Sequence, residues 1–148
     1  LKYRPAGGFC MFALNDPGPV VSWSVRDHER RPKLGWDALR RACEPVIVVA
    51  DRPPAVVAPG DRIRLDVHVV NDLRHPIEPA VVDVVATWHG GGRRWRFGGG
   101  VGPDDCERVG TIEVVAPETP GMMTFGLTLT ADDLTTTNHY STMVTALP

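Results

Sequence analysis

Residues 20–46 read VVSWSVRDHERRPKLGWDALRRACEPV, and this stretch decides how the rest of the chain is interpreted. Val20 to Val25 predicts a short buried strand, which is followed by a polar turn and by an amphipathic helix that begins at Pro32 and ends at Pro45. A strand that is buried on both faces needs parallel neighbours and a covering layer of helices. Only one such strand and helix precede a change to antiparallel patterning. We therefore expect residues 1–45 to be the tail of a larger α/β domain whose body lies upstream.

The helical pattern is clearest over residues 33–43. Apolar side chains fall on one stripe of this segment, namely Trp36, Leu39, Ala42 and Cys43. Pro32 suits the first turn of a helix, and Pro45 disfavours helical geometry at Glu44. A helix this short is not stable alone in water. The Trp36 stripe is therefore expected to pack on another surface.

Beyond Asp51 the hydrophobic pattern changes to a period of two, which is typical of half-buried strands. The segments that show it are 62–69, 81–88 and 123–130, with shorter candidates at 46–50, 95–97, 109–115 and 135–145. About seven short strands separated by Gly, Pro, Asn and Asp predict a mainly β fold, an immunoglobulin-like antiparallel β-sandwich over residues 46–148. The Cys-Trp-Cys spacing of antibody domains is missing. Arg93 to Arg96 predicts an edge strand, where charge discourages pairing with another molecule.

The composition argues against several classes of partner. The chain has 148 residues and a formal net charge of −2, so nothing favours binding to nucleic acid or to an anionic membrane. No apolar run approaches the length of a membrane helix, and no signal peptide is visible. Cys10, Cys43 and Cys106 match neither a metal spacing nor a disulfide framework, so we expect free thiols and a cytoplasmic location. The start at Leu1 is unlike a natural terminus, which favours a chain that has been cut.

The residue types that carry chemistry are scattered. The five histidines have no second metal ligand at a suitable spacing, and no nucleophile motif is present. Gly98-Gly99-Gly100 is interpreted as a hairpin turn rather than a phosphate cradle, because no Lys-Ser/Thr follows it. Asp104-Asp105 and Asp132-Asp133 are paired carboxylates in turn contexts and are expected to be solvated. We predict no catalytic residue, no metal site and no cofactor in this chain.

Trp23 is the candidate for substrate binding. It lies at the end of the expected parallel strand, and in barrel enzymes this end forms the active-site face. An indole offers a flat apolar surface that suits the C–H face of a sugar ring. The alternative is a tryptophan of the core.

Several short blocks of residues 4–46 occur in a familiar order. They are Arg4 to Phe9, Phe12 to Asp16, Val21 to Val25 with Asp27, Arg31 to Lys33, and Leu39, Ala42 and Pro45-Val46. This segment resembles the end of the catalytic barrel in bacterial β-mannosidases of glycoside hydrolase family two. In those enzymes the last strand and helix of a (β/α)8 barrel run into a C-terminal immunoglobulin-like domain. The resemblance is weaker over residues 47–148, where it rests on the sandwich pattern and on Asn71-Asp72.

The resemblance implies a retaining hydrolase that uses two carboxyl groups. Both catalytic glutamates of the family lie on earlier barrel strands, and no glutamate here matches either, the candidates being Glu29, Glu44, Glu78, Glu107, Glu113 and Glu118. The chain alone is therefore expected to be inactive. Its implied partners are the upstream barrel of the same polypeptide and, through it, a carbohydrate substrate.

The resemblance also implies positions for other polar residues. Trp23 would lie at the rim of the sugar pocket, and Asn15 and Asp16 in the loop before the last strand. Arg31 and Lys33 would lie where the final helix begins. Two functions follow from the sequence. One is the C-terminal piece of a β-mannosidase-like hydrolase whose sandwich supports the barrel. The other is a stand-alone immunoglobulin-like module that binds carbohydrate or protein.

Overall fold

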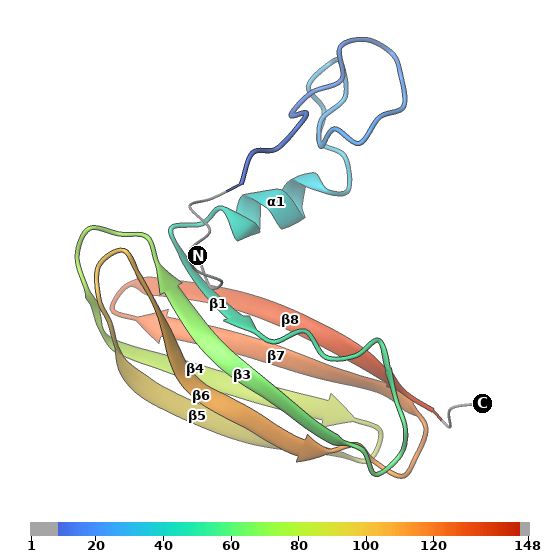
Figure 1. Cartoon of the computed structure of the whole chain (residues 1–148), viewed down its shortest axis with the longest axis vertical. Coiled ribbons are helices and arrows are strands. Elements are labelled where there is room, and N and C mark those ends of the chain that lie inside the picture. Colours follow the sequence, from blue (N-terminus) through green and yellow to red (C-terminus); the bar gives the residue numbers. More distant parts are fainter. Residues whose placement is uncertain (1–8, 146–148) are drawn as a thin grey trace. The chain divides into compact units, whose positions relative to one another are not determined.

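The computed structural model describes residues 9–145, which divide into two compact units with the boundary between Pro45 and Val46. Residues 46–145 of the second unit contain eight strands, whose arrangement is seen in Figure 1. They are β1 (Val46–Ala50), β2 (Val56–Val57), β3 (Arg62–Asn71), β4 (Ile77–Trp88), β5 (Gly91–Val101), β6 (Asp105–Val115), β7 (Gly121–Ala131) and β8 (Leu134–Val144). The mainly β fold predicted from the sequence is confirmed.

The strands form two sheets that pack as an immunoglobulin-like sandwich. One sheet has the order β1-β3-β6 and the other the order β2-β8-β7-β4-β5. All pairs are antiparallel except β2 with β8. β5 and β6 are therefore the edge strands on the same side of the two sheets, and they lie side by side in Figure 1. The predicted edge position of Arg93 to Arg96 is confirmed.

The core of the sandwich is built from the alternating residues that the sequence pattern indicated. On β3, β4 and β7 every second side chain is buried between the sheets, while its neighbours face outward. The largest fully buried side chains include Phe125, Leu65, Ile112, Met123, Leu127 and Leu129. Burial of such side chains contributes about 1.5–3 kcal/mol each. The unit therefore has a hydrophobic core of its own.

Polar side chains join β1 of one sheet to β8 of the other. Tyr140 on β8 faces inward, and its hydroxyl oxygen accepts a hydrogen bond from the backbone N–H of Ala50 on β1 (3.1 Å). Asn138 Nδ2 donates to the carbonyl of Val48 (3.0 Å) and to the Tyr140 hydroxyl (3.1 Å). β1 is thus held to the opposite sheet by hydrogen bonds as well as by packing.

Asn71 fixes the loop that follows β3. Its side chain is fully buried, and Nδ2 donates to the carbonyls of His75 (3.0 Å) and Gly102 (2.9 Å). Its Oδ1 accepts from the N–H of Leu73 (3.0 Å). One amide therefore satisfies backbone groups of two loops that are distant in sequence. The loop after β3 ends at Pro76, and β4 begins at Ile77.

The glycine run at 98–100 is not a turn, and this expectation was wrong. Gly98 and Gly99 lie within β5, opposite Val81 and Ala80 of β4. A Cβ at position 100 would come within 3.0 Å of Glu78 Cδ, so the absence of a side chain makes room for this neighbour. The turn between β4 and β5 lies instead at His89-Gly90, where Gly90 has φ +79°.

The first unit is mostly irregular. Its helix α1 (Trp36–Ala42) begins four residues after Pro32, because the backbone of Lys33 is used elsewhere. The N–H of Lys33 donates to the carbonyl of Val25 (2.9 Å), and a turn at Leu34-Gly35 precedes the helix. No residue of α1 is buried, so the expected packing of the Trp36 stripe is not observed.

The strand expected at Val20 to Val25 does not form. Among residues 9–45, the strand-like pairing is limited to isolated bridges that join Arg26 to Asn15 and to Pro32. Ser24 and Val25 are buried, whereas Val20 and Val21 are exposed. Within residues 9–145, no helix is long and apolar enough to cross a membrane.

Candidate functional site

Trp23 lies on an exposed bend of the first unit rather than in a core. Its side chain is 73% exposed, which contradicts the alternative of a core tryptophan. The conformation of the bend is nevertheless fixed, because Ser22 and Ser24, on either side of Trp23, both donate hydrogen bonds to the carboxylate of Asp16. The sequence pattern identified Trp23 but not the polar groups that hold it.

Asp16 is the centre of these polar groups. Its side chain is 1% exposed, and it forms an ion pair with Lys33. Oδ1 accepts hydrogen bonds from the hydroxyls of Ser22 and Ser24, the latter at 2.6 Å. The hydrogen bond from Lys33 and those from the two serines lower the pKa of Asp16 to about 2. The carboxylate is therefore charged at neutral pH and fixes both neighbours of Trp23.

Lys33 adds further contacts to the same network. Its Nζ donates to Ser24 Oγ (2.9 Å) and to the carbonyl of Ser22 (3.4 Å). The backbone N–H of Asp16 donates to the carbonyl of Arg26 (3.0 Å). Asp16 was expected in the loop before the last strand and Lys33 at the start of the final helix. The structure instead brings them together beneath the bend that carries Trp23.

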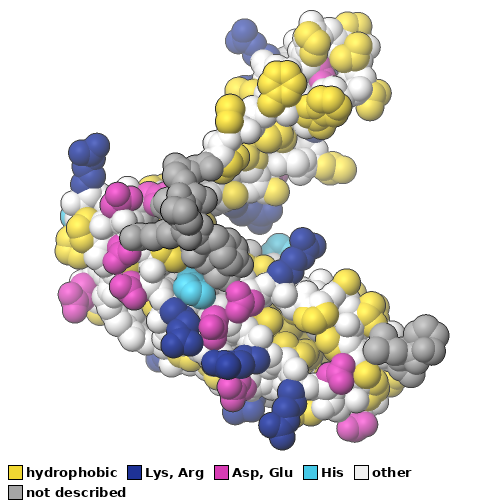
Figure 2. All heavy atoms as spheres, viewed as in Figure 1, with side chains coloured by type: hydrophobic (Ala, Val, Ile, Leu, Met, Phe, Trp, Pro, Cys, Tyr) yellow, Lys and Arg dark blue, Asp and Glu magenta, His cyan; other side chains and the backbone are white. Residues whose placement is uncertain are grey.

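Apolar side chains of the first unit face solvent around this network, and Figure 2 shows hydrophobic atoms over much of the visible face of the unit. Val21 is fully exposed and Phe12 is 78% exposed. Others that are largely exposed are Phe9, Leu14, Val20, Trp23 and Leu34. Large contiguous apolar patches are unusual on the surface of soluble monomers.

Trp36 is only partly covered. The guanidinium of Arg26 lies over its ring, 5.0 Å from the centroid. A cation–π contact at an exposed site contributes about 0.5–1 kcal/mol.

The side-chain oxygen Oδ1 of Asn15 is buried and, among the described residues, has no hydrogen-bond partner. Arg31 binds Glu29 in an exposed ion pair.

The other chemical candidates stay apart. Asp104, Asp132 and Asp133 lie in turns as predicted, with φ of +50° at Asp104 and +47° at Asp132. Asp105 does not, because it is the first residue of β6 and is partly buried. The three cysteines form no disulfide. Within residues 9–145, no group of three or more His, Cys, Asp or Glu side chains is arranged to hold a metal ion.

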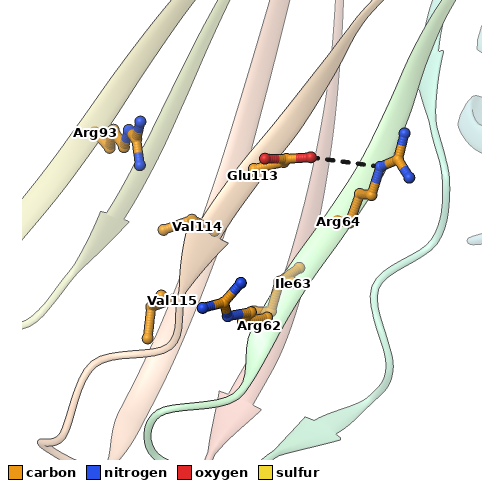
Figure 3. A pocket seen from close by; sticks show the side chains of 7 residues that line it. All are labelled: Arg62, Ile63, Arg64, Arg93, Glu113, Val114 and Val115. Carbon is orange, nitrogen blue, oxygen red and sulfur yellow. Dashed lines mark ion pairs between the residues drawn. The ribbon is translucent and has the colours of Figure 1, made fainter.

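The sandwich contains a concave site that the sequence did not indicate. A pocket of about 400 Å³ is lined by Arg62, Ile63 and Arg64 of β3, by Glu113, Val114 and Val115 of β6, and by Arg93 of β5 (Figure 3). Glu113 points toward Arg64, and the two charged groups are 3.6 Å apart. We call this site the arginine pocket.

Comparisons with known proteins find no matching family model and no similar curated protein. Among solved structures, the chain is similar to the CARDB domain of the PF1109 protein from Pyrococcus furiosus. The crystal structure of that domain with di-metal ions is 19% identical, with a TM-score of 0.53 over 68% of this chain and 87% of that one. Its solution structure is 20% identical, with a TM-score of 0.55 over 68% and 94% of the two chains.

A glycoside hydrolase of family 123 from Clostridium perfringens is also similar. It is 12% identical, with a TM-score of 0.50 over 70% of this chain and 28% of that one. At these identities the likeness shows the fold alone, an immunoglobulin-like β-sandwich module. It does not show the specific identity with the C-terminal domain of family two that the sequence suggested.

Proposed function

We propose that this chain is the C-terminal part of a β-mannosidase-like glycoside hydrolase, in which the first unit completes a catalytic barrel and the sandwich supports it. The observation that carries the proposal is the exposed apolar surface of the first unit, formed by side chains such as Phe12 and Val21. Such side chains are normally covered, and the upstream barrel of the same polypeptide would cover them. The resemblance of residues 4–46 to the end of such a barrel supports the same partner.

In this proposal Trp23 stacks on a sugar ring at the rim of the active site. Its exposed indole and the fixed bend beneath it support this role, because a platform that is already ordered loses little entropy when it binds. The chemistry itself would come from two carboxyl groups of the upstream barrel. The chain would contribute substrate binding and support.

The coding sequence before Leu1 provides the first test. We expect βα units with two glutamates, each after a barrel strand. In the enzyme encoded by that longer sequence, Trp23→Ala should lower kcat/KM for an aryl β-mannoside by about 5- to 10-fold, mainly through KM. Met122→Ala, which removes an exposed side chain of the sandwich, is the control. An upstream sequence without a barrel pattern would refute the proposal.

The chain itself provides a second test. It should bind a hydrophobic dye such as anilinonaphthalene sulfonate, and Phe12→Ser combined with Val21→Ser should reduce the fluorescence. Val115→Ser alters an exposed apolar residue of the sandwich and should have little effect. The chain should also give no hydrolysis of an aryl β-mannoside above background. Measurable turnover would mean that a catalytic pair lies within it.

A stand-alone binding module is the second candidate. The observation that favours it is the self-contained core of the sandwich, since every residue of the main hydrophobic cluster lies between Val46 and Val144. Such a module would not require the first unit for folding. A chain of residues 46–148 that binds the same ligand as the whole chain would favour this function.

A further inference from the structure

The arginine pocket lies where the two edge strands of the sandwich, β5 and β6, run side by side. At one position along this margin the strands are in close contact, because the ring of Phe97 occupies the space that a Cβ of Gly110 would fill. Arg93 precedes Phe97 by four residues on β5, and Val114 follows Gly110 by four residues on β6. There the margin opens into the pocket.

The charges around the pocket do not balance. Three guanidinium groups and one carboxylate line it, which gives a formal charge of +2 in a chain whose net charge is −2. Glu113 pairs with Arg64. Arg62 and Arg93 make no ion pair with any described residue. A concave site lined by one sign of charge raises the local concentration of ligands of the opposite sign.

The pocket also has features that orient a ligand. The guanidinium of Arg93 lies 5.2 Å from the centroid of the Trp95 ring, and this contact restrains an otherwise mobile side chain. Val115, which is 53% exposed, provides apolar surface beside the charged groups, and Ile63 and Val114 line the pocket from the core. Arginine presents a planar array of donors that matches the oxygens of a carboxylate, sulfate or phosphate. Apolar walls with a few convergent polar groups are typical of small-molecule sites.

We propose that the arginine pocket binds a small organic anion, whose oxyanion group lies between Arg62 and Arg93 and whose body contacts the apolar lining. Glu113 competes with this ligand for Arg64. The ligand class is a carboxylated, sulfated or phosphorylated small molecule such as an acidic sugar. The proposal does not depend on the function proposed above, because all seven lining residues belong to the sandwich.

The test uses the whole chain, labelled with ¹⁵N, in amide correlation spectra at constant ionic strength. The probes are methyl β-D-glucuronide, its uncharged counterpart methyl β-D-glucoside, and sodium sulfate. Glucuronide should give saturable shifts at residues 62–64 and 113–115, and glucoside should not. If sulfate binds as tightly as glucuronide, the oxyanion group accounts for the whole interaction. If sulfate binds more weakly, the sugar body contributes as well. Either result supports the site.

Substitutions should change the affinity in opposite directions. Arg62→Gln and Arg93→Gln should each raise the Kd for glucuronide about 5- to 10-fold, because each removes a charge-assisted hydrogen bond. Glu113→Gln should lower the Kd by a few fold, since it frees Arg64. Arg94→Gln is the matched control, because residue 94 does not line the pocket.

An increase in affinity on Glu113→Gln would not follow from general damage to the fold, so it distinguishes binding from stability. The proposal is overturned if glucuronide gives no saturable shift, or if glucoside gives the same shifts. It is also overturned if Arg62→Gln and Arg93→Gln leave the Kd unchanged, or if Glu113→Gln raises it. Each variant should first show a spectrum with the dispersion of the native fold.

Discussion

Gly110 on β6 makes room for the ring of Phe97 on β5, and Gly110→Ala tests this contact between the two sheets. A Cβ at position 110 would lie 2.2 Å from Phe97 Cδ1 and 2.4 Å from Cε1, well inside van der Waals contact. The ring must therefore move, or the edge strands must separate. Overpacking of this kind costs about 1–3 kcal/mol. Replacing a strand glycine by alanine recovers up to about 1 kcal/mol of backbone entropy. We expect a net loss of about 1–2 kcal/mol in the free energy of unfolding.

Gly126 on β7 is the matched control. It also lies inside a strand, but a Cβ there would meet only the carbonyl oxygen of Val85, at 3.9 Å. Gly126→Ala should therefore be neutral or should stabilise the protein by up to about 1 kcal/mol. Urea denaturation followed by far-ultraviolet circular dichroism measures both variants. The free energy of unfolding should fall with urea concentration at the same slope in both variants, because the surface exposed on unfolding is unchanged.

A double-mutant cycle assigns the cause. In a Phe97→Ala background the ring is gone, so Gly110→Ala should no longer be destabilising. The coupling energy between the two positions should then be about 1–2 kcal/mol. The reasoning is refuted if Gly110→Ala is as stable as the native chain. It is also refuted if its cost is unchanged in the Phe97→Ala background.

Three further predictions concern buried polar groups. Thr142 is 1% exposed, and its hydroxyl has no hydrogen-bond partner among the described residues, so Thr142→Val should raise the free energy of unfolding by about 1 kcal/mol in urea denaturation. Thr124→Val, which removes an exposed hydroxyl bonded to Thr87, should give no such gain. Asn71→Ala leaves carbonyls of two loops unsatisfied and should cost about 2–3 kcal/mol in the same assay, whereas a loss below the error of the measurement would contradict the role of its amide. The pKa of Asp16 is lowered from 3.8 to about 2, so its stabilisation of the Trp23 bend is complete above pH 3.8 and is lost as the pH falls toward 2. Amide exchange at residues 22–24 should accelerate over this range, and Asp16→Asn should abolish the pH dependence.

The sandwich was predictable because its signals are local and repeated. Alternation on β3, β4 and β7 follows directly from burial on one face of a sheet, and each of these strands carries it over at least four buried positions. The glycine run at 98–100 was wrongly predicted to be a turn. Glycine is common in turns, but it also fits an edge strand beside Glu78. Only the pairing of β5 with β4 distinguishes the two cases.

The arginine pocket could not be predicted, because its residues come from three strands that are distant in sequence. Alternation indicates that Arg62 and Arg64 share one face of β3, but the register of β3 with β6 brings Glu113 opposite Arg64. Arg93 joins them only because β5 and β6 are both edge strands on one side of the sandwich. In the sequence, Arg93, Arg94 and Arg96 indicated a charged edge strand but not a binding site.

The first unit shows a different limit. Val20 to Val25 has the composition of a buried strand, yet a strand of this kind is stabilised by hydrogen bonds to neighbours on both sides. No neighbouring strand of the described chain pairs with this segment, and its residues form isolated bridges instead. The conformation of the segment is held instead by Asp16, which contacts Ser22, Ser24 and Lys33. These contacts take the place of hydrogen bonds to neighbouring strands. Under the proposed function, docking on an upstream barrel would supply the neighbours, cover Phe12 and Val21, and leave Trp23 facing the substrate. The upstream barrel would then explain both why the segment is apolar and why its side chains are exposed in this chain.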